Sequence, residues 1–357
     1  MEEKTTENKN IKKSSPLWHN PIGRFIRDNL GILIGLLVLC MILVIYDYFR
    51  GRTVFLSTNN IMNVLRQVST NLYIACAMTM VIILGGIDLS VGSILSLSGC
   101  VTAMLLMYNE FSLTAAVLMG LLVGAAFGAF NGLVVAKTTI PPFIVTLATM
   151  NIARGASYVY TGGQPIRVMS DSFNFIGSGY VFKVIPVPVI YLVIIVAISA
   201  FIMNRTKLGR HIYAVGGNPV AARFSGIKNS RVLFFAFLFS GLMSAVSGIV
   251  LASRMFSGQP TAGLGAELDA IAAVVLGGTS MSGGVGKIGG TVIGALIIGV
   301  LNNGLNLLNV NSFWQYIVKG AAILIAVYVD FLKKDPKKLQ AVYSFINRFI
   351  LRRSPAS

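Results

Sequence analysis

One short polar segment, between two long apolar runs, carries residue types that could do chemistry. It reads GGIDLSVGS, residues 85–93, and holds the carboxylate of Asp88, the hydroxyl of Ser90 and three glycines. Glycine lets the backbone turn and lets neighbouring chains approach closely. Asp88 or Ser90 could cap the helix that begins near Gly92 or line a path or gate for a solute. Asp88 could instead couple transport to protons. The sequence leaves these roles open.

A second set of polar residues lies inside otherwise apolar runs. Its members are Asn131, Asn151, Arg154, Glu267, Asp269, Asn302, Asn303, Asn306 and Lys319. Asn302, Asn303 and Asn306 share a helical face by i, i+3 and i+4 spacing. Amides on such a face either join helices or line a hydrophilic path, for which Asn131 is a further candidate. Arg154 and Lys319 are expected to extend to lipid headgroups at the outer face.

Several kinds of catalytic site are disfavoured. The run GGTSMSGGVGKIGG, residues 277–290, resembles a phosphate loop but has Met281 and Ile288 where that motif needs Gly and Ser or Thr. The histidines, His19 and His211, both lie outside the apolar runs. Glu267 and Asp269, two residues apart on a helix, do not face each other. We therefore expect no catalytic residue, no cofactor, no metal site and no ATPase activity in the chain itself.

The elements that must position these residues are membrane-spanning helices. Of 357 residues, 55% are hydrophobic and 11% charged, with a mean hydropathy of +0.77. An ordinary soluble domain is about 25% charged. Because about 20 apolar residues cross a bilayer, we predict an all-α polytopic membrane protein with ten spans. They are 30–46, 65–84, 92–108, 112–135, 142–160, 186–203, 232–251, 266–276, 288–307 and 313–330. The eighth is too short to cross alone, so residues 277–290 should complete it as irregular backbone shielded from lipid.

Basic residues indicate how the chain is oriented. Six Lys or Arg lie in the N-terminal tail, six in residues 204–231 and seven in the C-terminal tail. A nucleic-acid-binding surface would interleave its charges with a soluble fold, so this pattern argues against nucleic acid. It favours cytoplasmic loops, with both termini cytoplasmic. The expected layout is a tail at 1–29, a membrane domain at 30–332 with a cytoplasmic loop at 204–231, and a tail at 333–357.

The cytoplasmic loop contains a short helix with clear start and stop signals. In GGNPVAARFSGI, residues 216–227, Asn218 is the expected N-cap, Pro219 the first helical residue and Gly226 the C-terminal stop. Such a short helix needs packing to be stable. Its basic flanks suit docking on a partner, and the alternative is a loop resting on lipid headgroups.

A faint internal duplication indicates an inverted repeat. Asn131-Gly132-Leu133 ends span 4, and Asn303-Gly304-Leu305 ends span 9. Because span 6 is unpaired, spans 2–5 and 7–10 should run through the membrane in opposite directions, a common transporter plan.

These segments resemble the permease of monosaccharide ABC importers, of the ribose, xylose, arabinose and galactose branch. The resemblance covers about residues 30–332 and rests on GGIDLSVGS, GGNPVAARFSGI, and ELDAIAAVVLGGTS with GGVGKIGG. QPTAG at 259–263 and LNNGLNLL at 301–308 look closest to ribose permeases. The resemblance implies a homodimer in a bacterial cell membrane, with two copies of an ATPase inside and a sugar-binding protein outside.

The resemblance also assigns the short cytoplasmic helix as the coupling helix that contacts the ATPase. The implied residues are Gly216, Gly217, Asn218, Pro219, Ala221, Ala222, Arg223, Ser225 and Gly226. Val220 stands where permeases usually carry Glu, so an acidic contact to the ATPase is lost or moved. The rival interpretation is an ion-coupled secondary transporter using Asp88 or Asp269, which would work without ATP.

Overall fold

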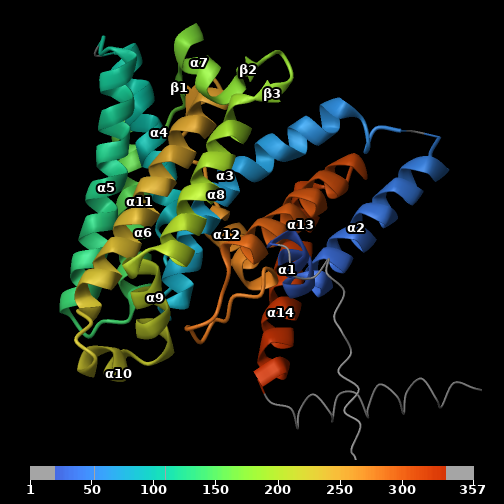
Figure 1. The fold of residues 1–357 in the computed structure, drawn as a ribbon. Helices are drawn as coiled ribbons and strands as arrows, with labels where there is room; N and C mark the ends of the chain where they lie inside the picture. The colour runs from blue at the N-terminus through green and yellow to red at the C-terminus, as the bar shows by residue number, and fades with distance from the viewer. Residues whose placement is uncertain (1–20, 52, 109, 335–357) are drawn as a thin grey trace, which may run out of the picture.

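The computed structural model describes residues 21–51, 53–108 and 110–334, and Figure 1 shows a bundle of long helices. The helices are α1 (Pro21–Asp28), α2 (Leu30–Phe49), α3 (Thr58–Ile83), α4 (Val91–Met107), α5 (Leu113–Lys137), α6 (Pro142–Thr161), α7 (Asp171–Ser178), α8 (Val187–Arg205), α9 (Lys207–Gly217), α10 (Pro219–Phe224), α11 (Asn229–Arg254), α12 (Ala266–Leu276), α13 (Ile288–Leu307) and α14 (Ser312–Lys334). The N-terminal tail to residue 20 and the C-terminal tail from residue 335 lie outside the described residues.

Two small antiparallel ribbons complete the described secondary structure. β1 (Ile166–Arg167) pairs with β4 (Ser257–Gly258), and β2 (Tyr180–Val181) pairs with β3 (Ile185–Pro186). Figure 1 shows these ribbons and α7 at one end of the bundle, and α9 and α10 at the opposite end. The two ends therefore carry different loop structures.

Every one of the ten predicted spans coincides with a helix: α2 to α6, α8 and α11 to α14. The prediction of an all-α chain with apolar helices is therefore confirmed. Among the described residues, five helices are long and apolar enough to cross a membrane by length and composition: α2, α5, α8, α11 and α13. The helix α12 has only 11 residues, and the chain from 277 to 287 has no regular secondary structure. Residues 288–290, which the predictions include both in the irregular stretch and in the span 288–307, begin α13.

The helices of the two predicted repeats pack in equivalent pairs. α5 packs on α11 as α13 packs on α3, and α4 contacts α5 and α6 as α12 contacts α13 and α14. Exchanging α3–α6 with α11–α14 therefore reproduces these contacts. This is the arrangement that two intertwined repeats produce.

A row of glycines holds α5 against its neighbours. Gly120, Gly124, Gly128 and Gly132 recur every fourth residue and are all buried. A Cβ on Gly128 would lie 2.6 Å from the carbonyl oxygen of Phe237 in α11. Such small residues let membrane helices approach backbone to backbone.

Candidate functional site

Asp88 lies at the centre of a buried hydrogen-bond cluster. Its Oδ1 accepts from the Ser90 backbone N–H at 3.0 Å and from Ser90 Oγ at 2.5 Å. Its Oδ2 accepts from Ser240 Oγ of α11 at 2.7 Å. Asn131 Nδ2 of α5 donates to Ser90 Oγ at 2.9 Å, and Thr149 Oγ1 of α6 donates to Asn131 Oδ1 at 2.6 Å. These five side chains are fully buried or nearly so.

The prediction that Asp88 or Ser90 caps the helix is wrong in its geometry. Ser90 occupies the N-cap position of α4 but makes no side-chain capping bond. The backbone N–H and the hydroxyl of Ser90 both donate to Asp88 Oδ1, and Asp88 Oδ2 accepts from Ser240 of α11. The cluster therefore joins the start of α4 to α5, α6 and α11. The turn glycines behave as predicted: Gly85 has a φ of +79°, and a Cβ on Gly92 would overlap the carbonyl oxygen of Gly263.

The three asparagines of α13 have different surroundings. Asn303 exchanges two amide hydrogen bonds with Asn60 of α3, at 3.1 and 2.8 Å. Asn306 Oδ1 accepts from Gln315 Nε2 of α14 at 2.8 Å. Asn302 is 6% exposed, and its Oδ1 has no hydrogen-bond partner. Asn303 and Asn306 therefore join helices, whereas the side-chain oxygen of Asn302 does not.

Asn302 lines a cavity of about 140 Å³. Polar side chains come from Gln67, Thr70 and Asn71 of α3, Ser247 of α11 and Asp269 of α12. None of the residues from α3 or α11 was singled out from the sequence. Gln67, Thr70 and Asn71 lie in the first turns of the predicted span 65–84, where polar residues are common. Only the packing of the neighbouring helices shows that they line a cavity.

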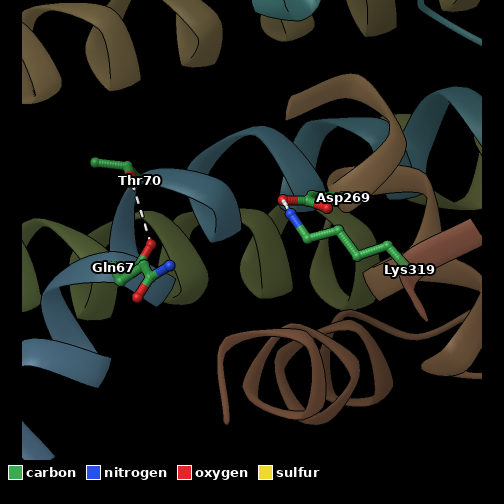
Figure 2. Close-up of polar contacts among 4 residues, drawn as sticks. All are labelled: Gln67, Thr70, Asp269 and Lys319. Atoms are coloured by element: carbon green, nitrogen blue, oxygen red, sulfur yellow. Dashed lines mark hydrogen bonds and ion pairs between the residues drawn. The ribbon is translucent and has the colours of Figure 1, made fainter. Parts of the chain in front are cut away.

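Two basic residues do not extend to the headgroups as predicted. Lys319 Nζ of α14 forms an ion pair with Asp269 Oδ2 at 2.9 Å, and the two side chains point toward one another in Figure 2. Arg154 donates to the carbonyl oxygens of Pro260 and Ala262 at 2.7 and 2.8 Å. The prediction failed because both partners come from the chain before and at the start of α12, far away in the sequence.

The glycine-rich loop, residues 277–287, packs on the C-terminal end of α3 and on α9. Gly284 N donates to the carbonyl oxygen of Ile83 at 2.8 Å, and Tyr213 OH donates to that of Gly286 at 2.8 Å. A Cβ on Gly216 would overlap the Ile83 oxygen. Burial raises the pKa of Tyr213 above its usual value, which keeps the phenol protonated. These contacts fasten α9 to the end of α3 and to the loop that precedes α13.

The short helix predicted after Asn218 is present. The side chain of Asn218 accepts from the backbone N–H groups of Val220 and Ala221, and Pro219 begins α10. Gly226 has a φ of +84°, and Ile227 N donates to the carbonyl oxygen of Ala222 at 3.0 Å. This pattern is a Schellman stop. α10 has six residues, one fewer than predicted, because Ser225 forms its C-cap.

The residues assigned to the coupling helix separate into two elements. Gly216 and Gly217 are the last residues of α9, a helix that was not predicted, and the others belong to α10 and its caps. Ala222 is buried, whereas Val220 is 63% and Phe224 89% exposed. Beside α10 lies a cavity of about 450 Å³ lined in part by His211, Lys228 and Arg231. This end of the bundle thus presents apolar side chains beside basic ones.

Among the residues that the structure describes, no group of three or more His, Cys, Asp and Glu side chains could hold a metal ion. Cys40, Cys76 and Cys100 are free thiols.

Comparison with known proteins places the chain in a family. The family described as "Branched-chain amino acid transport system / permease component" matches residues 60–327. The ribose import permease of Bacillus subtilis is 49% identical over 307 residues, which cover 85% of this chain and 93% of the relative. That of Haemophilus influenzae is 45% identical over 314 residues, covering 87% and 94%. The xylose transport system permease of Escherichia coli is 34% identical, covering 85% and 92%. No solved structure matches. The chain therefore belongs to the family of transport-system permease components that this description names.

Proposed function

We propose that the chain is the membrane-spanning subunit of an ATP-binding-cassette importer that carries a monosaccharide, ribose by preference, into the cytoplasm. The observation that carries this proposal is α10, a capped helix that presents Phe224 and Val220 outward at one end of the bundle. Exposed apolar side chains on such a helix mark a protein-docking surface. The similarity to ribose import permeases supports the choice of sugar.

Energy reaches the chain through a separate ATPase subunit. When the ATPases close, they displace α10 together with α9, since Asn218 ends one helix and caps the next. α9 contacts the Ile83 end of α3 and, through Tyr213, the loop that leads into α13. Because these two helices belong to different repeats, a displacement of α9 acts on both repeats at once.

The proposed assembly follows the same reasoning. The chain forms ten spans with both termini in the cytoplasm of a bacterial cell and with spans 2–5 and 7–10 as inverted repeats. Two copies form a homodimer that binds two ATPase subunits inside and a sugar-binding protein outside. Membrane lipid is a further partner of the chain. Asp88, Ser90, Asn131, Asn303 and Asn306 support the helices around the solute path.

The docking surface is tested with Phe224→Asp. The substitution places a charge where the ATPase should bury an apolar ring, so we expect co-purification of the ATPase and ATP-driven D-ribose uptake to be lost. Membrane insertion should be unchanged because the ring makes no core contact. Phe182→Asp is a matched control for co-purification, since Phe182 is 88% exposed and lies between β2 and β3 at the opposite end.

The rival, an ion-coupled transporter, makes the opposite prediction. Purified chain alone, reconstituted in vesicles with a proton or sodium gradient, would then accumulate D-ribose without ATP. We expect no accumulation under these conditions. Accumulation would refute the importer proposal, as would unchanged co-purification of the ATPase with Phe224→Asp.

A further inference from the structure

The cavity that contains Asn302 lies where the two repeats meet. Its walls come from α3 and α4 of one repeat and from α11, α12 and α13 of the other. It lies about midway along α3 and beside the first turn of α12. Figure 2 shows Gln67 and Thr70 on α3 and the Asp269–Lys319 pair.

Two amide oxygens in this cavity have no partner. Asn302 Oδ1 and Asn71 Oδ1 are inaccessible to solvent and accept no hydrogen bond. By contrast, the amides of Asn60, Asn131 and Asn303 are all bonded to other side chains. Buried amides are normally satisfied. Asn174 Oδ1 and Asn229 Oδ1 also lack a partner but do not line this cavity, whereas Asn302 and Asn71 lie together where a ligand could supply the missing donors.

The charge in the cavity favours a neutral ligand. Its carboxylate, Asp269, is neutralised by Lys319 at 2.9 Å. The other polar lining groups are amides and hydroxyls, and Ile74, Leu95, Leu251 and Ile298 provide apolar walls. Amides both donate and accept hydrogen bonds, which matches the hydroxyl groups of a sugar. The apolar walls match the C–H face of its ring. A bare cation would find no unpaired carboxylate among these lining residues.

We propose that this cavity is a monosaccharide site inside each chain, in which Asn302 and Asn71 donate to and accept from sugar hydroxyls. The inference rests on the proposed function and makes it more specific. Sugar released from the binding protein enters a pocket between the repeats of one protomer. It does not travel only along the interface between two protomers. Movement of α13 relative to α3 then opens the pocket toward the cytoplasm.

The site is tested first by chemical protection. Asn302→Cys, in an otherwise unchanged chain, is treated with a small charged methanethiosulfonate reagent, and the wild-type chain gives the background from its three cysteines. We expect labelling of Asn302→Cys to slow in the presence of D-ribose. Asn151→Cys is the matched control because Asn151 lies exposed on α6 and bonds only its own helix. Its labelling should not depend on the sugar.

The second test is D-ribose uptake by the full complex in vesicles. Asn302→Leu and Asn71→Leu keep the side-chain size but remove the amide. We expect the initial uptake rate to fall about tenfold for each, which corresponds to about 1.4 kcal/mol, the loss of one good hydrogen bond. ATPase co-purification should be unchanged, and Asn151→Leu should transport normally.

Unprotected labelling of Asn302→Cys together with normal uptake by both leucine variants would overturn the site while leaving the importer intact. If the wild-type complex takes up no D-ribose, the proposed function fails. In that case, protection of Asn302→Cys by D-ribose still decides whether the cavity binds a sugar.

Discussion

Asn60 and Asn303, 243 residues apart in the chain, donate to each other through their side-chain amides at 3.1 and 2.8 Å. Both are buried, and Asn60 Nδ2 also donates to the carbonyl oxygen of Phe55. The pair joins the first turn of α3 to the last turns of α13. It thereby ties α3 to α13 next to Asn302, which lines the cavity between these helices.

Removing both amides of this pair should cost less than the two single removals added together. Asn303→Leu leaves the Asn60 amide without its partner and should destabilise the fold by about 1–3 kcal/mol. The double variant Asn60→Leu with Asn303→Leu should lose less than the sum of the single changes. Denaturant titration in detergent measures the free energy of unfolding of the wild type, the two single variants and the double variant. Strict additivity would show that the two amides do not act as a pair.

Asp88 should act through its hydrogen bonds and not by carrying a proton. Asp88→Leu leaves the hydroxyls of Ser90 and Ser240 without an acceptor and should lower the yield of folded protein. Asp88→Asn keeps one oxygen that accepts from Ser90, and its amide N–H can donate to Ser240 Oγ. Uptake should therefore persist. The measurement is ATP-driven uptake normalised to the amount in the membrane.

Ser244→Ala serves as the control for Asp88, since the Ser244 hydroxyl donates only to the backbone of its own helix. If Asp88→Asn folds normally but abolishes uptake, the carboxylate itself has a role in transport. The structural interpretation of the cluster would then be wrong.

The glycine contact between α5 and α11 should be intolerant of side chains. Gly128→Val would place its Cβ against the backbone of Phe237 and Gly241, and we expect a loss of about 1–3 kcal/mol. Gly155→Val, in the exposed part of α6 with nothing within 4 Å of the added Cβ, should be neutral. Thermal unfolding in detergent compares the two, and equal effects would contradict the packing argument.

Tyr213 should make stability depend on pH in the alkaline range. Burial raises its pKa in the folded state, so the folded protein holds the phenol proton more tightly than the unfolded chain. The contribution of Tyr213 to the free energy of unfolding is complete below about pH 10, the pKa of a free phenol. It is lost as the pH rises through the folded-state pKa. Tyr213→Phe should remove this component of the pH profile. Unfolding midpoints of both proteins across this range give the test, and parallel profiles would exclude Tyr213 as the cause.

Much of the fold could be predicted from the sequence because membrane spans are long apolar runs. The ten helices coincide with the predicted segments within four residues, except that α3 begins seven residues earlier than predicted. Asn218, Pro219 and Gly226 locate α10 by local capping chemistry. α9 was missed because its sequence, KLGRHIYAVGG, contains three glycines and is held in place by Ile83 and the loop that contains Gly284. Local propensity does not encode such contacts.

The polar sites were only partly predictable for a related reason. Asp88 and Asn302 stood out as polar residues in apolar surroundings, but their partners did not. Ser240 is one of many serines in α11, and Lys319 meets Asp269 only because α14 packs on α12. The lining of the cavity that contains Asn302 depends on which faces of α3 and α13 meet. A single sequence with unassigned helix faces does not specify this.

The glycine row of α5 limits how the transporter can change shape. Gly124, Gly128 and Gly132 bring the backbones of α5 and α11 together so closely that an added Cβ at any of them would overlap atoms of α11. We therefore expect these two helices to move as one unit, although the sequence assigns them to different predicted repeats. On the proposed function, the movement that opens the cavity containing Asn302 is therefore expected between α13 and α3, which both line it.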